Sequence, residues 1–411
     1  MKKRLLLLGG GFEQLNALRI AQELGAEVIV FDGHETAACA FEACEFYQVN
    51  IKDHAALIAK AKELRLDAVF VHAAELAIEC ALVAEAVGLP GISVESAKLG
   101  TDKTLRAACL LRAGVRIPKY QPLTAASDWS AWRNAGDALG YPIIAKPTKL
   151  AGAQGVEFIP DEIALQRYFE GKQSFKAQDF LLEEFLQGTQ LSTESVALDG
   201  ALVCTSIALR HYDTTQHLWP HQIEDGHSMP YDASLELQNS IDDVTEKCRA
   251  AFGIETGVLK GDLIISPSGE IIVLEMAVRT SGGRFCDTVV PVSTGVNILY
   301  PLIQYALGQT PDPAYLKADR HVGVSQRFVL IPEGNRLKEY KTIQHILLQE
   351  DVIGWWFRDD LQDLAQAPKI MSHRDRIGYV ICSADTRDNA DKRAQTIVEQ
   401  LVKAITLETL T

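Results

Sequence analysis

Two acidic residues are predicted to converge in the segment KGDLIISPSGEIIVLE, residues 260–275. SPSG is a turn signal between two apolar runs, so the segment predicts a β-hairpin that brings Asp262 near Glu275. Carboxylates that meet from adjacent strands form a hard-oxygen site suited to Mg²⁺, which binds carboxylates, phosphate and water. The alternative is an edge hairpin that carries ordinary surface acids.

The second strand of this hairpin continues into EMAVRTSGGR, residues 275–284. An acid at a strand end, followed by an arginine and two glycines, indicates charge chemistry beside a phosphate. Ala277 stands between the acid and the arginine, where a polar side chain would be more useful.

A lysine and a glycine loop follow one another in YPIIAKPTKLAGAQGV, residues 141–156. Lys146 ends an apolar strand, and the loop after it contains Gly152 and Gly155. Such a loop can fold over phosphates while the lysine neutralises them. The segment is no Walker A motif, because no GK[ST] follows. A surface lysine with a hairpin loop is the alternative.

The N-terminal run GGGF, with Asp32 about twenty positions further on, partly matches a dinucleotide-binding fingerprint. The pattern fails at Gln14, where the third glycine should be. The helix start could still hold an anion through its backbone N–H groups. A tight turn that feeds a Rossmann-like helix is the simpler interpretation, and a dehydrogenase is disfavoured.

Other catalytic signatures are absent from the sequence. Four histidines at 211, 217, 221 and 227 have no tidy zinc spacing, and we expect them in a loop near a cleft. HEXXH and GXSXG are both missing, and no serine or cysteine stands out as a nucleophile. The eight cysteines form no CxxC pair, which favours a reduced, cytoplasmic protein over a disulfide or zinc framework.

The sequence argues against two classes of partner, nucleic acids and membranes. A net charge of -14 argues against general nucleic-acid binding, which needs a basic surface. No stretch approaches the roughly 20 apolar residues of a membrane span. With 411 residues, 47% of them hydrophobic and 23% charged, the chain is expected to be a soluble globular protein of two or three domains.

The chain falls into three regions that must position these residues. Residues 1–100 alternate apolar strands and helices, which predicts a parallel sheet covered on both faces. Residues 101–310 hold short β-rich runs with glycine-rich connections, typical of a mixed α+β domain. After PDPAY, a predicted linker, residues 311–411 contain two strand-like runs and a helix over 389–405, which predicts a small α/β domain.

In their order along the chain, these segments resemble the ATP-grasp superfamily. The segments are TDK at 101–103, AKP at 145–147, AGAQGV, EEF at 183–185, the pair Asp262 and Glu275, and R-x-x-G-G from Arg279. Residues 1–100 look like the Rossmann-like domain that precedes the ATP-grasp fold in biotin carboxylase and the purine-pathway carboxylases. The last hundred residues look more like the L-amino-acid ligase branch.

The resemblance assigns roles to individual residues. It implies ATP contacts from Lys103, Lys146 and the loop with Gly152, Gln154 and Gly155, and an adenine hinge of Glu183, Glu184, Phe185 and Leu186. Gln190 stands where the family usually has a ribose-binding Glu, and Glu194 follows on the same strand; both are expected among the ATP contacts. Asp262 and Glu275 would hold Mg²⁺, with Mn²⁺ as an alternative ion. Arg279, with Gly282, Gly283 and Arg284, would face the substrate carboxylate or acyl phosphate.

Where the family usually shows Glu-x-Asn, this chain has Glu-x-Ala. The resemblance therefore implies that Ala277 removes one side-chain metal ligand, and we expect water in that position and retained activity. It also implies a small-molecule carboxylate and a small-molecule amine as substrates, and the homodimer that is common in the family.

The implied reaction is ATP-dependent ligation: the γ-phosphoryl group converts a carboxylate into an acyl phosphate, and an amine displaces phosphate to form an amide. The protein mainly positions groups and neutralises charge, so no protein nucleophile is needed. Two alternatives stay open. One is a purine-pathway carboxylase resembling N5-carboxyaminoimidazole ribonucleotide synthase, and the other is a nucleotide-binding regulator without turnover, which Ala277 and Gln190 would suit.

Overall fold

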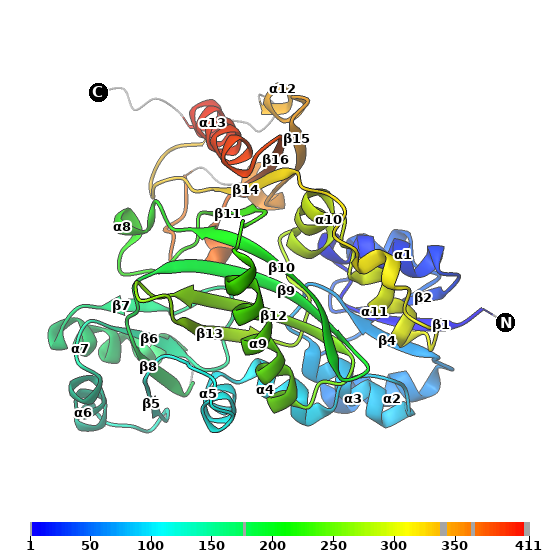
Figure 1. The fold of residues 1–411 in the computed structure, drawn as a ribbon, viewed down its shortest axis with the longest axis horizontal. Helices are drawn as coiled ribbons and strands as arrows, with labels where there is room; N and C mark the ends of the chain where they lie inside the picture. The colour runs from blue at the N-terminus through cyan, green and yellow to red at the C-terminus, as the bar shows by residue number, and fades with distance from the viewer. Residues whose placement is uncertain (1, 176–177, 338–342, 363–365, 407–411) are drawn as a thin grey trace.

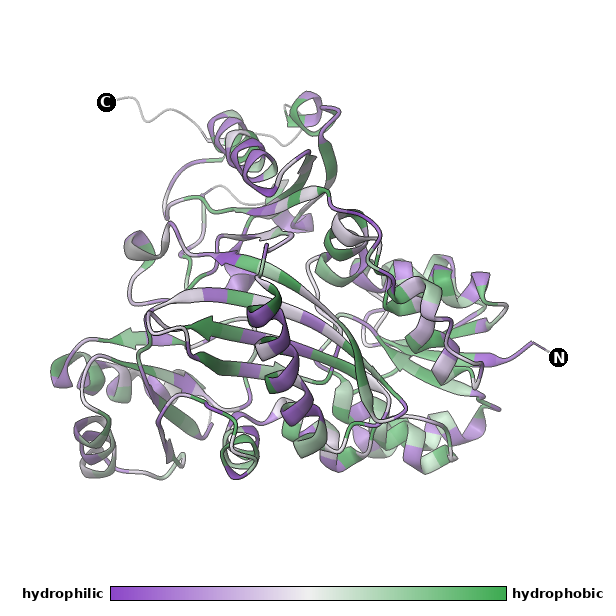
Figure 2. Ribbon diagram, viewed as in Figure 1, coloured by the Kyte–Doolittle hydropathy of each residue, from purple (hydrophilic) through white to green (hydrophobic). Residues whose placement is uncertain are grey.

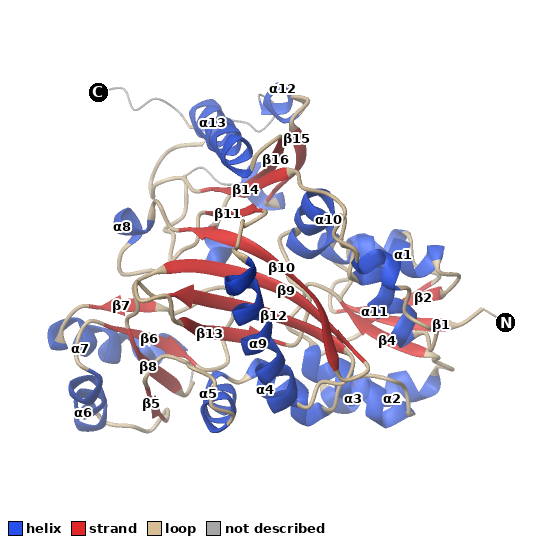
Figure 3. Cartoon of the chain, in the orientation of Figure 1, coloured by secondary structure: helices blue, strands red, loops and turns tan. Residues whose placement is uncertain are grey.

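The computed structural model describes residues 2–175, 178–337, 343–362 and 366–406, and Figures 1 and 3 show three sheets with their helices. Most of the residues left out fall in the predicted C-terminal domain. The N-terminal domain and a small sheet flank opposite ends of one large sheet. The mixed α/β fold agrees with the prediction, while the predicted domain limits stay predictions. None of the described helices has the length and apolar character needed to cross a membrane.

The N-terminal sheet is parallel, with strand order β3-β2-β1-β4. Leu5 and Leu7 pack with α1 on one face, while Leu6 and Leu8 pack with α2 and α3 on the other. This is the alternation of a strand buried on both sides, and it explains the uninterrupted apolar run. The elements are β1 (Arg4–Leu8), α1 (Leu15–Glu23), β2 (Glu27–Asp32), β3 (Glu45–Gln48), α2 (His54–Glu63), β4 (Ala68–Val71) and α3 (Ala77–Val87), with 3₁₀ turns Phe12–Gln14 and Ala38–Phe41.

Two helices lead to a small antiparallel sheet of order β5-β8-β6-β7. Its core is aromatic: Trp132 is fully buried, with its ring centroid 5.1 Å from that of Phe180 and 5.9 Å from that of Tyr168. The elements are α4 (Val94–Thr101), α5 (Lys103–Arg112), β5 (Tyr120–Leu123), α6 (Trp129–Leu139), β6 (Ile143–Pro147), β7 (Glu157–Ile159), α7 (Glu162–Gly171), a 3₁₀ turn (Lys172–Phe175) and β8 (Phe180–Glu184).

The large sheet is antiparallel, in the order β13-β12-β9-β10-β11-β14-β16-β15. It crosses the predicted boundary at residue 310, because β11 pairs with β14. Helix α9 covers one face, and Figure 2 shows its outward side as largely hydrophilic. Its elements are β9 (Thr189–Leu198), β10 (Ala201–His211), α8 (Thr215–Leu218), β11 (Gly226–Met229), α9 (Leu235–Phe252), β12 (Gly257–Ile265) and β13 (Ile271–Ala277).

The C-terminal part continues this sheet and links it to the N-terminal domain. Helix α11 packs on α1, and α13 packs on β14 and β16. The elements are a π-helical turn (Phe285–Val289), α10 (Val290–Thr294), α11 (Leu299–Ala306), β14 (Gly323–Val329), α12 (Gln344–Leu347), β15 (Val352–Phe357), β16 (Gly378–Ala384) and α13 (Arg387–Ile405), with 3₁₀ turns Pro313–Leu316, Asp359–Gln362 and His373–Asp375. The predicted PDPAY linker thus forms part of a 3₁₀ turn.

Candidate functional site

A cavity of about 390 Å³ lies among the small sheet, the large sheet and the N-terminal domain. Thirteen of the predicted site residues line it: Lys103, Lys146, Gly152, Glu183, Glu184, Phe185, Leu186, Gln190, Asp262, Glu275, Arg279, Gly282 and Gly283. Gln154 and Gly155 line a second cavity beyond the glycine loop. Glu194 and Arg284 line neither of these two cavities. The structure therefore brings most of the predicted residues together from segments far apart in the sequence.

Strand alternation explains which side chains reach the cavity. On β12, Leu259 and Leu263 pack in the core under α9, whereas Lys260 and Asp262 line the cavity. The register of β12 and β13 shifts after Asp262, and this shift places Glu275 directly opposite Asp262. The predicted hairpin and its converging acids are confirmed.

Two lysines face the cavity from different elements. The Lys146 ammonium, at the end of β6, forms an ion pair of 2.6 Å with Glu183 on β8. Lys103 begins α5, and its Nζ donates to the Leu150 carbonyl oxygen at 2.6 Å. Burial lowers the pKa of Lys103 to about 8, although Glu275 acts in the opposite direction. Both lysines can neutralise the phosphates of a nucleotide at this wall.

The glycine loop has the backbone that its sequence requires. Gly152 and Gly155 have φ of +64° and +69°, a region that glycine adopts without steric cost. A Cβ at Gly155 would lie 2.8 Å from the Phe175 ring. The loop also contacts the C-terminal part, since the His373 N–H donates to the Gly152 carbonyl oxygen at 2.9 Å.

The hinge at the end of β8 is fixed by its own side chains. The Glu184 carboxylate accepts hydrogen bonds from the Lys119 N–H at 2.8 Å and from Arg116 at 3.1 Å. The ring centroids of Phe185 and Phe158 lie 4.8 Å apart. The hinge and Gln190 line the same cavity as the lysines, as the predicted adenine and ribose roles require.

The two predicted metal ligands have different surroundings. Asp262 accepts a hydrogen bond from Ser192 at 2.9 Å and forms ion pairs with Lys260 and, at 2.9 Å, with Arg210. Among the residues that the structure describes, Glu275 has one ion pair, with Arg106 at 3.4 Å, and its side chain is 40% exposed. Burial acts to raise the pKa of Glu275, but nearby cations hold it well below its usual range: Arg106, Lys103, Lys260 and Lys146.

This donor set fits a divalent cation through Glu275, whose carboxylate is ionised and faces the cavity. It fits less well through Asp262, whose two oxygens already contact protein donors. In the described part of the chain, no three histidine, cysteine, aspartate or glutamate side chains group as a metal site. A bound cation would therefore need phosphate oxygens and water as further ligands.

Arg279 meets an acid from the N-terminal domain. Its Nε donates to Glu75 Oε1 at 2.9 Å, and its Nη2 lies 2.5 Å from the same oxygen. Glu75 follows β4 in the loop before α3 and also lines the cavity. Thr280 anchors this junction, because its hydroxyl contacts His72 Nδ1 at 2.8 Å and accepts from the Ala73 N–H at 3.0 Å.

Two predicted residues have other partners. Glu194 is fully buried and accepts hydrogen bonds from the Ser281 hydroxyl and, at 3.1 Å, the Ser281 N–H. Arg284 forms an ion pair with Asp287 at 3.3 Å, and its guanidinium lies over the Phe12 ring. Both residues support the segment that carries the two glycines, and neither lines the main cavity.

Residues 139–288 match a family model described as ATP-grasp domain. The chain therefore contains an ATP-grasp domain.

The formate-dependent phosphoribosylglycinamide formyltransferase of Methanocaldococcus jannaschii is 25% identical over 277 residues, which cover 64% of this chain and 68% of that protein. Alanine–anticapsin ligase of Bacillus subtilis is 26% identical over 225 residues, 48% of this chain and 45% of that ligase. The match thus spans less than half the length of the ligase.

Solved structures show the same fold over the whole chain. The L-amino acid ligase from Bacillus licheniformis has a TM-score of 0.79 and 16% identity, with 99% of both chains covered. The phosphoribosylglycinamide synthetase from Anaerococcus prevotii has a TM-score of 0.74 and 19% identity, with 100% of both chains covered.

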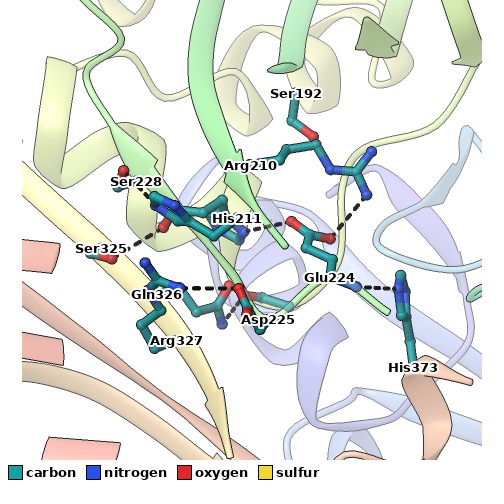
Figure 4. A network of polar contacts seen from close by, with 12 residues as sticks. Ser192, Arg210, His211, Glu224, Asp225, Ser228, Ser325, Gln326, Arg327 and His373 are labelled. Carbon is teal, nitrogen blue, oxygen red and sulfur yellow. Dashed lines mark hydrogen bonds and ion pairs between the residues drawn. The ribbon is translucent and has the colours of Figure 1, made fainter. Parts of the chain in front are cut away.

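Beside the ATP-grasp motifs lies a polar network that the sequence analysis did not find. Figure 4 shows Glu224 between Arg210 and His373. Glu224 forms an ion pair of 3.1 Å with Arg210, and its N–H lies 3.4 Å from His373 Nε2. Burial acts to raise the pKa of Glu224, but Arg210, His227 and Arg376 hold it well below its usual range. The network joins the ATP-grasp sheet to the C-terminal part at the cavity wall.

The expectation for the histidines was wrong in part. Residues 226–229 form β11, and His227 is a buried strand residue at the cavity wall. His221 is also buried, His211 ends β10, and His217 is exposed on α8. The four-residue strand was missed because its short polar sequence, GHSM between Asp225 and Pro230, is typical of a loop.

A second cluster ties the C-terminal helix to the sheet, and Figure 4 shows two of its members, Arg327 and Asp225. Arg327 on β14 forms ion pairs with Asp213 at 2.9 Å, Asp225 at 3.0 Å and Asp391 on α13 at 2.8 Å. Arg327 does not line the main cavity. The cluster therefore holds β14 and α13 in place behind the site.

Proposed function

We propose that this protein is an ATP- and Mg²⁺-dependent ligase that activates a small carboxylate, an amino acid or similar acid, as an acyl phosphate and joins it to an amine. One observation carries the proposal: a single cavity holds two phosphate-neutralising lysines, an ionised Glu275 and the Arg279–Glu75 pair. The relatives named as ligases support it.

The reaction follows from this arrangement. A carboxylate oxygen attacks the γ-phosphorus of ATP, and ADP leaves. The amine nitrogen then attacks the acyl carbon, the C–O bond to phosphate breaks, and the nitrogen releases a proton. Lys103 and Lys146 neutralise the phosphates, and Arg279 holds the acid. When Mg²⁺ is bound, it adds further neutralisation of the phosphate charge, with Glu275 as its protein ligand.

The Arg279–Glu75 pair favours an amino acid as the acid. It places one positive and one negative group at the same end of the cavity. A free amino acid carries the complementary carboxylate and ammonium on one carbon, so both of its charges can be matched there.

The proposal is tested by phosphate release from ATP with pools of amino acids and amines, followed by mass analysis of products. Lys146→Ala and Glu275→Gln should each reduce substrate-dependent turnover by at least 100-fold, a loss typical of groups that stabilise phosphoryl-transfer charge. The controls are Lys149→Ala and Glu270→Gln, which change exposed side chains a few residues away.

Unchanged phosphate release in the Lys146 and Glu275 variants would contradict the proposal. ATP binding without turnover across the whole panel would favour a regulator instead. Turnover that requires bicarbonate and aminoimidazole ribonucleotide would favour the carboxylase alternative.

A further inference from the structure

His227 and Gln326 form a cross-strand pair at the cavity wall. They are directly opposite in the register of β11 and β14, so their side chains project from the same face, with Cβ atoms roughly 5 Å apart. Both side chains line the cavity. Gln326 is fully buried and His227 is 6% exposed. The pair joins a strand of the ATP-grasp sheet to the first strand of the C-terminal part.

In the described part of the chain, each side chain has one polar atom engaged and one without a hydrogen-bond partner. Gln326 Nε2 donates to the Gly283 carbonyl oxygen at 2.7 Å, which orients the amide, and Gln326 Oε1 has no partner among the described residues. His227 Nδ1 lies 3.5 Å from the Glu224 carboxylate, and within the same described ranges its Nε2 has none. Buried polar groups are normally hydrogen-bonded, so these two atoms, which lack partners in the described part of the chain and belong to cavity-lining residues, are available to a ligand.

The chemistry of the two atoms defines what they can bind. Gln326 Oε1 is an acceptor, because the amide nitrogen is the group that donates to Gly283. An imidazole that directs its Nδ1–H toward Glu224 presents Nε2 as an acceptor as well. Two acceptors side by side match a group with two N–H donors.

The surroundings are suited to a small organic amine. The ring centroid of Phe285 lies 4.8 Å and that of Phe328 6.3 Å from the His227 ring. Both phenylalanines line the cavity, as does Gly283, which the amide of Gln326 contacts. The His227 ring thus lies beside two aromatic rings, and Gln326 contacts the segment that follows Arg279.

We infer that His227 and Gln326 bind the amino group of the acceptor amine and orient it for attack on the acyl phosphate. The inference rests on the proposed ligase function and specifies one subsite of it. The pair selects for a primary amine with at least two N–H donors, attached to a small apolar group.

Two substitutions at Gln326 distinguish amine binding from the structural hydrogen bond that its side chain donates to Gly283. Gln326→Leu removes both polar atoms, whereas Gln326→Glu keeps an acceptor oxygen but loses the N–H donated to Gly283. For the best amine found in the screen, Gln326→Leu should raise the KM about tenfold or more, the typical effect of one lost buried hydrogen bond. Gln326→Glu should stay within about threefold of the wild type.

The other substrates supply internal controls. The KM values for ATP and the acid, and acid-dependent ATP hydrolysis without amine, should stay within about twofold in both variants. An equal rise in the amine KM for both variants, or a rise in the KM of the acid instead, would overturn the inference. If Gln326→Leu keeps normal acid-dependent turnover and an unchanged amine KM, the amine subsite is wrong but the proposed ligase function stands. If the wild type shows no acid-dependent turnover, both the proposed function and the amine subsite are wrong.

Discussion

Lys260 lies directly opposite Ala277 in the pairing of β12 with β13, and its ammonium contacts the Asp262 carboxylate. In the pairing of β12 with its other neighbour, β9, Lys260 lies opposite Glu194. A fixed positive charge therefore stands beside the position where Ala277 offers no ligand. With Arg210 and Ser192, this lysine occupies the oxygens of Asp262, whereas Glu275 faces the cavity.

We therefore expect the protein to bind one divalent cation per chain together with ATP. Titration with Mn²⁺ and a non-hydrolysable ATP analogue, followed by the electron paramagnetic resonance signal of free Mn²⁺, should give one bound ion. The double variant Lys260→Met/Ala277→Asn frees Asp262 from the ammonium and adds an amide oxygen, so it should bind a second ion. Two ions in the wild type would contradict this account of Lys260.

The affinity for ATP should depend on pH through Lys103. Its pKa of about 8 in the ligand-free protein lies below the ordinary value of 10.5, so the ammonium loses its proton as the pH rises through 8. Because the phosphates need the charged form, ATP binding above this pH must take up a proton, and the Kd should rise by up to about tenfold per pH unit.

Calorimetric titration from pH 7 to pH 9.5 measures this effect. Lys103→Arg keeps its charge throughout the range and should bind ATP with little pH dependence. Lys103→Met should bind weakly at every pH. A wild-type Kd that stays constant up to pH 9.5 would show that Lys103 does not titrate as expected.

Replacing Arg279 should affect the acid more than ATP. Arg279→Lys retains the charge but loses the planar fork that pairs with Glu75, so kcat/KM for the acid should fall by roughly 100-fold. The KM for ATP should change by less than threefold. Arg284→Lys is the matched control, because Arg284 lies outside the cavity. Steady-state kinetics with each substrate varied in turn would distinguish the two arginines, and equal losses would contradict the assignment.

Much of the fold, and the meeting of the candidate metal- and phosphate-binding residues at one cavity, could be predicted because the signals are local. A turn between two apolar runs determines the hairpin, and strand alternation then brings Asp262 opposite Glu275. Lys146 was found in the same way, at the end of an apolar strand. The same alternation could also have identified Lys260, which is two residues before Asp262 and must face the same side.

The remaining site residues depend on contacts between segments far apart in the chain. Glu75 and Arg279 are separated by 204 positions, and no periodicity predicts such a pair. The position of Glu75 after a parallel strand was a usable signal, because ligands bind at the carboxyl ends of such strands. The pairing of His227 with Gln326 required β11, which the sequence did not reveal. The predicted homodimer and the cytoplasmic location stay predictions.

Substitutions at Glu194 test whether this residue stabilises the Ser281 segment or binds the nucleotide. Its buried carboxylate accepts two hydrogen bonds from Ser281, and burial raises its pKa although these bonds act in the opposite direction. Glu194→Ala should leave two buried donors unsatisfied and lower the free energy of unfolding by about 2–4 kcal/mol. Glu194→Gln keeps an acceptor and should lose less. Urea denaturation measures the stability, and a binding titration measures the Kd for ATP. If the Kd of Glu194→Gln stays within about threefold of wild type, Glu194 supports Ser281 and does not contact ATP. If ATP binds much more weakly to Glu194→Gln while the stability is unchanged, the predicted role of Glu194 as an ATP contact is restored.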